Sequence, residues 1–140
     1  MREILFRGKA INRDIGYHRT SYKNGNWVYG LVTRIYDERF ELPVEMTDIN
    51  GVSGIEVDYK TIGQYTGLTD KNGKKIFEGD IVSERPPMNT IAYIGKVVWD
   101  EEMTLFRVVF DTPSNCCILG TYSRSYTVIG NIYDNPELLK

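Results

Sequence analysis

The chain has 140 residues, 41% of them hydrophobic, and a formal net charge of −2, which fits one ordinary domain or two small ones that share a core. No stretch is long and apolar enough to predict a membrane span, and the first residues lack the apolar segment of a signal peptide. We therefore expect a cytoplasmic protein with no membrane partner, whose two cysteines are reduced.

The small net charge hides an uneven distribution along the chain. Residues 1–36 contain seven Lys and Arg against two acidic residues, a net charge of +5, whereas the remainder contains ten basic and seventeen acidic residues, a net charge of −7. A basic end on an acidic body could bind nucleic acid, or it could pair with acidic residues of the same chain or of a neighbouring subunit. We favour the pairing, because the overall negative charge would weaken binding to phosphates.

Short extended segments separated by turns fill the first 63 residues. The pattern predicts strands over residues 3–11, 27–36, 40–46 and 55–59. Gly30 indicates a bulge or a close backbone contact, and Pro43 places the third strand at a sheet edge. The connecting segments are predicted to be loops, and the first of these ends in a tight turn before Trp27.

Two turns divide the stretch from Gln64 to Val82. The first, residues 70–73, places Asn-Gly where a tight turn needs positive φ. The second, residues 78–80, separates two short apolar segments, and its glycine can take a left-handed conformation while its aspartate bonds the local backbone. A calcium loop starting at residue 70 is excluded, because its last ligand position is occupied by Ile81. We interpret the following residues as a structural turn motif: Gly67, Asp70, Asn72, Gly73, Glu78, Gly79 and Asp80.

This stretch closely resembles the signature of the YopX family, proteins carried mainly by bacteriophages and prophages. Residues 1–9, 25–30 and 128–139 resemble three further blocks of the family, and all four blocks stand in the family's order. The resemblance implies a β-rich fold and a phage setting. It implies no catalytic residues.

The segments after Val82 again favour strands. Strands are predicted over residues 91–99 and 105–110, joined by the acidic turn 100–102, and over residues 116–119 and 127–132. Asn135-Pro136 has the pattern of a helix start, with room for one turn before the chain ends. The order of segments from Ile76 onward resembles a small SH3-like barrel.

We therefore predict an all-β fold, mainly antiparallel, with one short C-terminal helical turn. A β region over residues 1–63 is expected to pack on an SH3-like barrel over residues 64–140, although the two regions could also form one compact domain.

The sequence offers little for catalysis or metal binding. The sole histidine, His18, lies in a polar loop, and Cys116 and Cys117 are predicted to be neighbouring strand residues on opposite faces. Nucleophile motifs and phosphate-binding loops are missing from the sequence. We therefore predict no catalytic residue, no metal and no cofactor, and a protein that is not an enzyme.

Recognition of a partner is the remaining class of function. The N-terminal third interleaves basic and aromatic residues, and its candidate binding residues are Arg13, Tyr17, Arg19, Tyr22, Lys23 and Trp27. The aromatic residues could stack on the bases of single-stranded nucleic acid and the basic residues could neutralise its phosphates, as in small β-barrels that bind single strands. Tyrosine-rich strands and opposed charges suit homo-oligomer formation or docking on an unknown phage or host protein. We favour a self-associating interaction module and keep the nucleic-acid-binding protein as the alternative.

Overall fold

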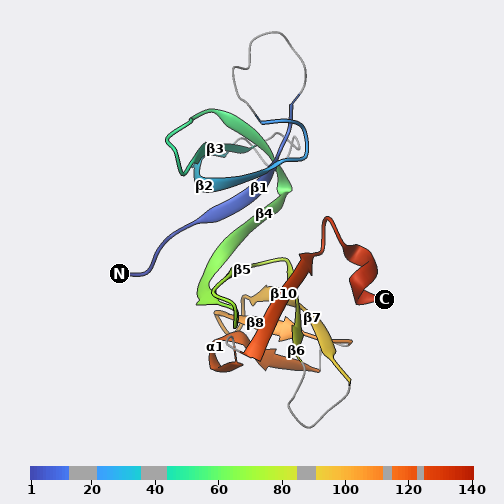
Figure 1. The fold of residues 1–140 in the computed structure, drawn as a ribbon. Coiled ribbons are helices and arrows are strands. Elements are labelled where there is room, and N and C mark those ends of the chain that lie inside the picture. The colour runs from blue at the N-terminus through green and yellow to red at the C-terminus, as the bar shows by residue number, and fades with distance from the viewer. Residues whose placement is uncertain (13–21, 36–43, 85–90, 112–114, 123–124) are drawn as a thin grey trace. The chain divides into compact units, whose positions relative to one another are not determined.

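The structure is a computed structural model that describes residues 1–12, 22–35, 44–84, 91–111, 115–122 and 125–140. Among these residues every strand pairing is antiparallel. The mainly antiparallel all-β prediction is confirmed, as is the short C-terminal turn, the 3-10 helix η3 (Pro136–Leu139) with proline at its start. The contacts divide the chain into two compact units, Met1–Gln64 and Tyr65–Lys140, which we call unit 1 and unit 2 (Figure 1).

Four strands of unit 1 pair in a closed ring. Strand β1 (Phe6–Ala10) pairs with β2 (Trp27–Arg34) and with β4 (Ile55–Thr69), while β3 (Val44–Asp48) joins β2 to β4. Because side chains alternate along each strand, one set points into the ring and forms the core. That core consists of Ala10, Val28, Val44, Met46, Ile55 and Val57.

The approach of β2 to β3 explains Gly30. A Cβ atom at this position would lie 1.9 Å from the carbonyl oxygen of Thr47, so only glycine fits without moving the strands apart. The predicted close backbone contact is therefore confirmed. The predicted edge position of the third strand is wrong, because β3 has a partner on each side. Pro43 and the start of that predicted strand lie outside the described residues.

Strand β4 joins two segments that the sequence pattern separated. Its register with β1 shifts between Arg7 and Lys9, so β4 carries extra residues there as a bulge. Thr61 closes the bulge: its Oγ1 accepts from the Lys9 amide at 2.8 Å and donates to the Asp58 carbonyl at 2.7 Å. A local polar side chain thus lets one strand continue from unit 1 into unit 2.

Unit 2 contains a second sheet and its own core. The end of β4 pairs with β5 (Lys75–Phe77), and the remaining strands stand in the order β10 (Tyr126–Asn131), β6 (Asp80–Glu84), β7 (Tyr93–Asp100), β8 (Leu105–Val109), β9 (Cys116–Ile118). The core consists of Ile76, Val82, Val97, Val108, Leu119, Tyr126 and Val128, with Leu119 supplied by the short helix α1 (Leu119–Tyr122).

The predicted hairpin with the acidic turn is present as β7–β8. The SH3-like barrel stays a prediction, because β10 and β9 are the two ends of this sheet order in the described residues. No helix in the described part of the chain is long and apolar enough to cross a membrane.

Candidate interaction surface

The first turn of the motif is organised by one buried carboxylate, that of Asp70. Its Oδ1 accepts from the amides of Asn72 at 2.8 Å and Lys74 at 2.9 Å. Its Oδ2 accepts from the amide of Val128 on β10 at 3.0 Å, which ties the turn to a strand far away in the sequence. Gly73 has a φ of 80°, whereas Asn72 is not left-handed, so the predicted positive φ falls on the glycine alone.

These contacts set the protonation of Asp70. Burial by itself would raise the pKa of the carboxyl group, but the amides of Val128, Lys74 and Asn72 hydrogen-bond the ionised form and the Lys74 charge adds to them. The pKa is therefore lowered from its ordinary value, and Asp70 is a carboxylate that stabilises the turn.

The same turn occurs in unit 1, where the sequence pattern predicted only a loop. Asp48 Oδ1 accepts from the amides of Asn50 and Val52, both at 2.9 Å, and Gly51 has a φ of 85°. Here the Oδ2 atom accepts from the hydroxyl of Tyr22 at 2.9 Å. The amide of Val52, then the Tyr22 hydroxyl and other amides, outweigh burial and lower the pKa of Asp48.

The second turn of the motif also has a structural explanation. Gly79 has a φ of 85°, and Asp80 Oδ2 accepts from the Phe77 amide at 2.8 Å, as the sequence predicts. Gly79 also donates to the Val97 carbonyl and accepts from the Ile132 amide, both at 2.9 Å. Glu78 precedes it in the same turn, and Gly67 has a φ of 84° within β4. Backbone geometry therefore accounts for Gly67, Gly79 and Asp80.

The candidate binding residues divide into three groups. Arg13, Tyr17 and Arg19 lie outside the described residues. Lys23 is exposed in the turn before β2. The remaining two, Tyr22 and Trp27, are each held by residues of unit 1.

Tyr22 is a structural residue rather than an open stacking platform. It packs against the core of unit 1 and donates its hydroxyl hydrogen to Asp48. Burial first, and then the hydrogen bond and charge of Asp48, raise the pKa of Tyr22 above its ordinary value.

Trp27 belongs to a cationic and aromatic surface on the outer side of β1 and β2. The guanidinium carbon of Arg7 lies 4.7 Å from the centre of the indole ring, and the ammonium of Lys9 lies 5.4 Å from it, both within range of a cation–π interaction. Tyr29 and Leu31 follow Trp27 on the same side of β2, because Val28 and Val32 point to the core. We call Arg7, Lys9, Trp27, Tyr29 and Leu31 the β1–β2 face.

Part of the β1–β2 face is apolar and open. Arg7 is only 5% exposed, whereas Tyr29 is 37% exposed and Leu31 is 50% exposed. Ile49, which is 71% exposed, lies beside them, because its amide donates to the Tyr29 carbonyl at 2.9 Å. Sequence analysis missed Arg7, Lys9, Tyr29 and Leu31, although their alternation with core residues is visible in both strands.

The uneven charge found along the chain is balanced inside unit 1. Residues 37–64 contain seven acidic and two basic residues, a net charge of −5, which cancels the +5 of residues 1–36. The ring places the two groups together: Lys9 lies opposite Asp58, and Arg34 forms an ion pair with Glu45 at 4.0 Å. Unit 1 as a whole therefore has no excess charge to attract a phosphate backbone.

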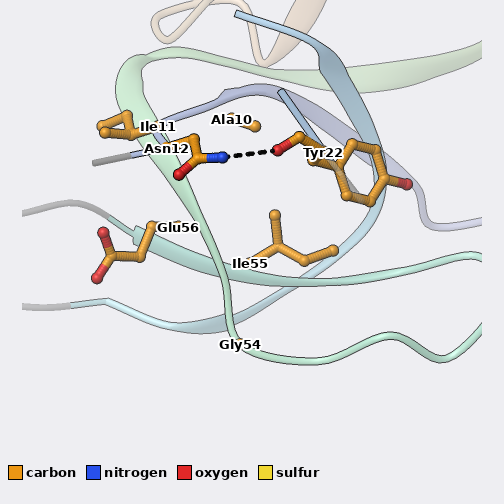
Figure 2. A pocket seen from close by; sticks show the side chains of 7 residues that line it. All are labelled: Ala10, Ile11, Asn12, Tyr22, Gly54, Ile55 and Glu56. Atoms are coloured by element: carbon orange, nitrogen blue, oxygen red, sulfur yellow. Dashed lines mark hydrogen bonds between the residues drawn. The ribbon is translucent and has the colours of Figure 1, made fainter. Parts of the chain in front are cut away.

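A small pocket in unit 1 lies between the end of β1 and the start of β4 (Figure 2). Its lining includes Asn12, whose side-chain amide donates to the Tyr22 carbonyl at 3.3 Å. The space inside it is about 10 Å³, which suits roughly one water molecule and no larger ligand.

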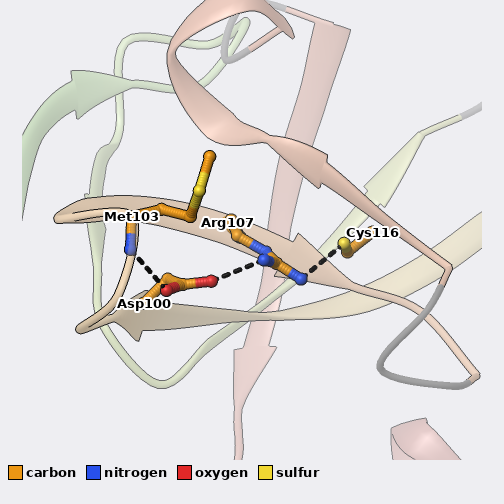
Figure 3. A network of polar contacts seen from close by, with 4 residues as sticks. All are labelled: Asp100, Met103, Arg107 and Cys116. Atoms are coloured by element: carbon orange, nitrogen blue, oxygen red, sulfur yellow. Dashed lines mark hydrogen bonds and ion pairs between the residues drawn. The ribbon is translucent and has the colours of Figure 1, made fainter.

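In unit 2 the main polar network lies on β7, β8 and β9 (Figure 3). Arg107 is paired with Asp100, and its other terminal nitrogen donates to the Cys116 sulfur at 2.7 Å. Both cysteines are free thiols in one short strand. Among the described residues no group of three or more His, Cys, Asp or Glu side chains could hold a metal ion.

The fold and the site together define a class: an antiparallel all-β protein of two units, each with an aspartate-centred turn, and with an open aromatic face on the first unit. Within that class the chain belongs to the YopX family, described as YopX protein, whose family model matches residues 6–140. The predicted family is therefore confirmed.

One solved structure extends this similarity. The chain is similar to the crystal structure of protein EF1440 from Enterococcus faecalis, with 25% sequence identity, a TM-score of 0.54 and 100% of each chain covered. No curated protein sequence matches the chain.

Proposed function

We propose that this protein is an interaction module without enzymatic activity, and that it self-associates through the β1–β2 face together with Ile49. The observation that carries the proposal is the exposure of Tyr29, Leu31 and Ile49 next to one another. Neighbouring exposed apolar residues are typical of sites that bind another protein, and aromatic residues are enriched there.

The core of unit 1 does not require these side chains. The ring is filled by residues on its inner side, and the outer positions of β2 could be polar without leaving a cavity. Their apolar character therefore supports a role outside folding.

Binding of single-stranded nucleic acid is the second candidate, because Arg7, Lys9 and Trp27 gather at one place. Two observations make it the weaker one. The ring of Trp27 already interacts with two cations, and unit 1 has a net charge of zero. We further propose the setting that the resemblance implies, a phage or host protein as additional partner in the cytoplasm of a bacterial cell, with no cofactor.

The test is light scattering of the full chain over a wide range of concentrations. Leu31→Ser should raise the dissociation constant of self-association roughly tenfold, because it removes an exposed apolar side chain from the face. The matched control is Ile118→Ser on β9 of unit 2, where the side chain is 49% exposed against 50% for Leu31.

Two outcomes would contradict the proposal. A strict monomer at every concentration would exclude self-association, and an equal effect of the two substitutions would exclude the β1–β2 face as its site. Fluorescence anisotropy with labelled single-stranded DNA at low salt addresses the second candidate, which requires binding that Trp27→Ala weakens.

A further inference from the structure

The β7–β8 hairpin ends in a tip with a fixed shape, formed by residues 100–104. Asp100 Oδ1 accepts from the Met103 amide at 2.9 Å, and Asp100 is also paired with Arg107 (Figure 3). Behind the tip, Trp99 and Phe106 pack edge to face with ring centres 4.9 Å apart. Thr104 has a φ of 53°, a conformation that β-branched residues avoid. The tip is therefore held in one conformation at a cost in backbone strain.

The tip presents acidic and apolar groups side by side. Glu101 and Glu102 are exposed, and Met103 between the acids and the strained threonine is 58% exposed. Residues 97–106 contain three acidic residues and no basic one. An exposed methionine at a rigid tip is suited to contact an aromatic ring.

The β1–β2 face has the opposite composition. The face contains the cations Arg7 and Lys9 and no acidic residue. At the tip Asp100 is paired with Arg107, which leaves the exposed Glu101 and Glu102 as its negative charges. Asp58 on β4 lies opposite Lys9 and offsets part of this charge at one border. The open part of the face is formed by Tyr29 and Leu31, which could receive Met103.

We infer that the β7–β8 tip of one copy docks on the β1–β2 face of a second copy. This inference rests on the proposed self-association and names its two surfaces. A symmetric contact of two β1–β2 faces would bring like charges together, whereas tip and face attract each other. Because the two surfaces differ, the contact is head-to-tail, and it closes into a ring or continues as an open chain.

The experiment places a charge on the open part of the face and then reverses the charge of the tip. Leu31→Glu and Leu31→Lys remove the same apolar contact and differ in sign, so each is the control of the other. We expect Leu31→Glu to self-associate roughly tenfold more weakly than Leu31→Lys, because only the glutamate is repelled by Glu101 and Glu102. When Glu101→Lys and Glu102→Lys are added to both variants, the order should reverse.

The inference is tested by which of the two Leu31 variants self-associates more strongly. If the two Leu31 variants associate equally, or keep the same order after the tip is reversed, the tip does not dock on this face, while self-association itself stands. If the unsubstituted protein is monomeric at every concentration, the proposed function fails and the inference fails with it. Thermal melts show whether each variant is folded, since all three substituted positions are exposed.

Discussion

The substitution Asp70→Asn tests whether the buried carboxylate organises unit 2. The asparagine carbonyl can still accept from the amides of Asn72 and Lys74, but its NH₂ group then takes the place of Oδ2. Oδ2 accepts from the Val128 amide, so two hydrogen-bond donors would face each other in a site where Asp70 is 3% exposed.

The expected loss follows from that one contact. A hydrogen bond to a charged group contributes about 1.5–3 kcal/mol, and a buried donor left without an acceptor costs about 1–3 kcal/mol. The two costs overlap, so we expect the free energy of unfolding of unit 2 to fall by about 2–4 kcal/mol. The Val128 amide cannot rotate away from the new NH₂ group, because the backbone of β10 is held by its pairing with β6.

Asp48→Asn is the matched control, because the same turn carries the same substitution. The third donor of that turn is the hydroxyl of Tyr22, which can rotate and accept a hydrogen bond from the new amide. We therefore expect a smaller loss in unit 1 than Asp70→Asn causes in unit 2.

The assay is urea unfolding followed by tryptophan fluorescence, since each unit has one tryptophan. Trp27→Phe leaves Trp99 as the reporter of unit 2, and Trp99→Phe leaves Trp27 as the reporter of unit 1. An Asp48→Asn loss as large as that of Asp70→Asn would refute the reasoning from the third donor.

Acid gives a second check on the same reasoning. Because the pKa of Asp70 is lowered in the folded protein, its stabilisation is complete above its ordinary value of 3.8 and is lost as the pH falls through the lowered value. The difference in unfolding free energy between the unsubstituted protein and Asp70→Asn should therefore narrow below about pH 3.8. If the difference in unfolding free energy stays constant as the pH falls, the charge of the Asp70 carboxylate does not contribute to stability.

Three further predictions concern single positions. Gly30→Ala should destabilise unit 1 by about 3 kcal/mol or more in urea unfolding, because its Cβ would overlap the Thr47 carbonyl, whereas Gly120→Ala, with no atom within 4 Å of the new Cβ, should change unit 2 little. Thr104→Gly should raise the free energy of unfolding of unit 2 by about 0.5–1 kcal/mol in thermal unfolding. The substitution relieves the strain of a threonine in the left-handed conformation, and this gain exceeds the entropic cost of glycine. In a titration of tyrosinate absorbance, Tyr22 should ionise above its ordinary pKa of 10.0, so unit 1 loses stability as the pH rises through that raised pKa, and Tyr22→Phe should remove this late step.

Local chemistry made the turns predictable from the sequence. Residue type alone predicts the positive φ of Gly73 and Gly79. It also predicts that the Asp80 carboxylate accepts a hydrogen bond from the nearby backbone. The β7–β8 hairpin was predictable because alternating apolar residues stand on both sides of an acidic turn. The Asp48 turn was missed although residues 48–51 repeat the Asp-x-Asn-Gly pattern of residues 70–73 and predicted strands flank them on both sides.

Long-range pairing was not predictable in the same way. The position of β3 between two strands depends on ring closure. Pro43 precedes Val44, the first residue of β3, and a proline at the start of a strand does not require an edge position. The merging of two segments into β4 depends on Thr61, whose contacts with Lys9 and Asp58 exist only after β1 has paired. The β1–β2 face likewise exists only after residues about twenty positions apart come together in the register of β1 and β2.

Four blocks of the sequence resemble the family. Within each unit two of these blocks contact each other, and folding explains the residues of the two contacts to different extents. In unit 2 the blocks 64–82 and 128–139 meet through Asp70 with Val128 and through Gly79 with Ile132, and the geometry of turns accounts for their polar residues. In unit 1 the blocks 1–9 and 25–30 meet as β1 and β2, where Gly8, Val28 and Gly30 satisfy the core and the close approach of strands. Neither a turn nor the core needs the outward residues of that second pair to be cationic or aromatic. In these two blocks Lys9, Trp27 and Tyr29 are therefore the outward residues that neither the turns nor the core explain. Substitutions of these residues should separate function from folding more cleanly than substitutions in the turns.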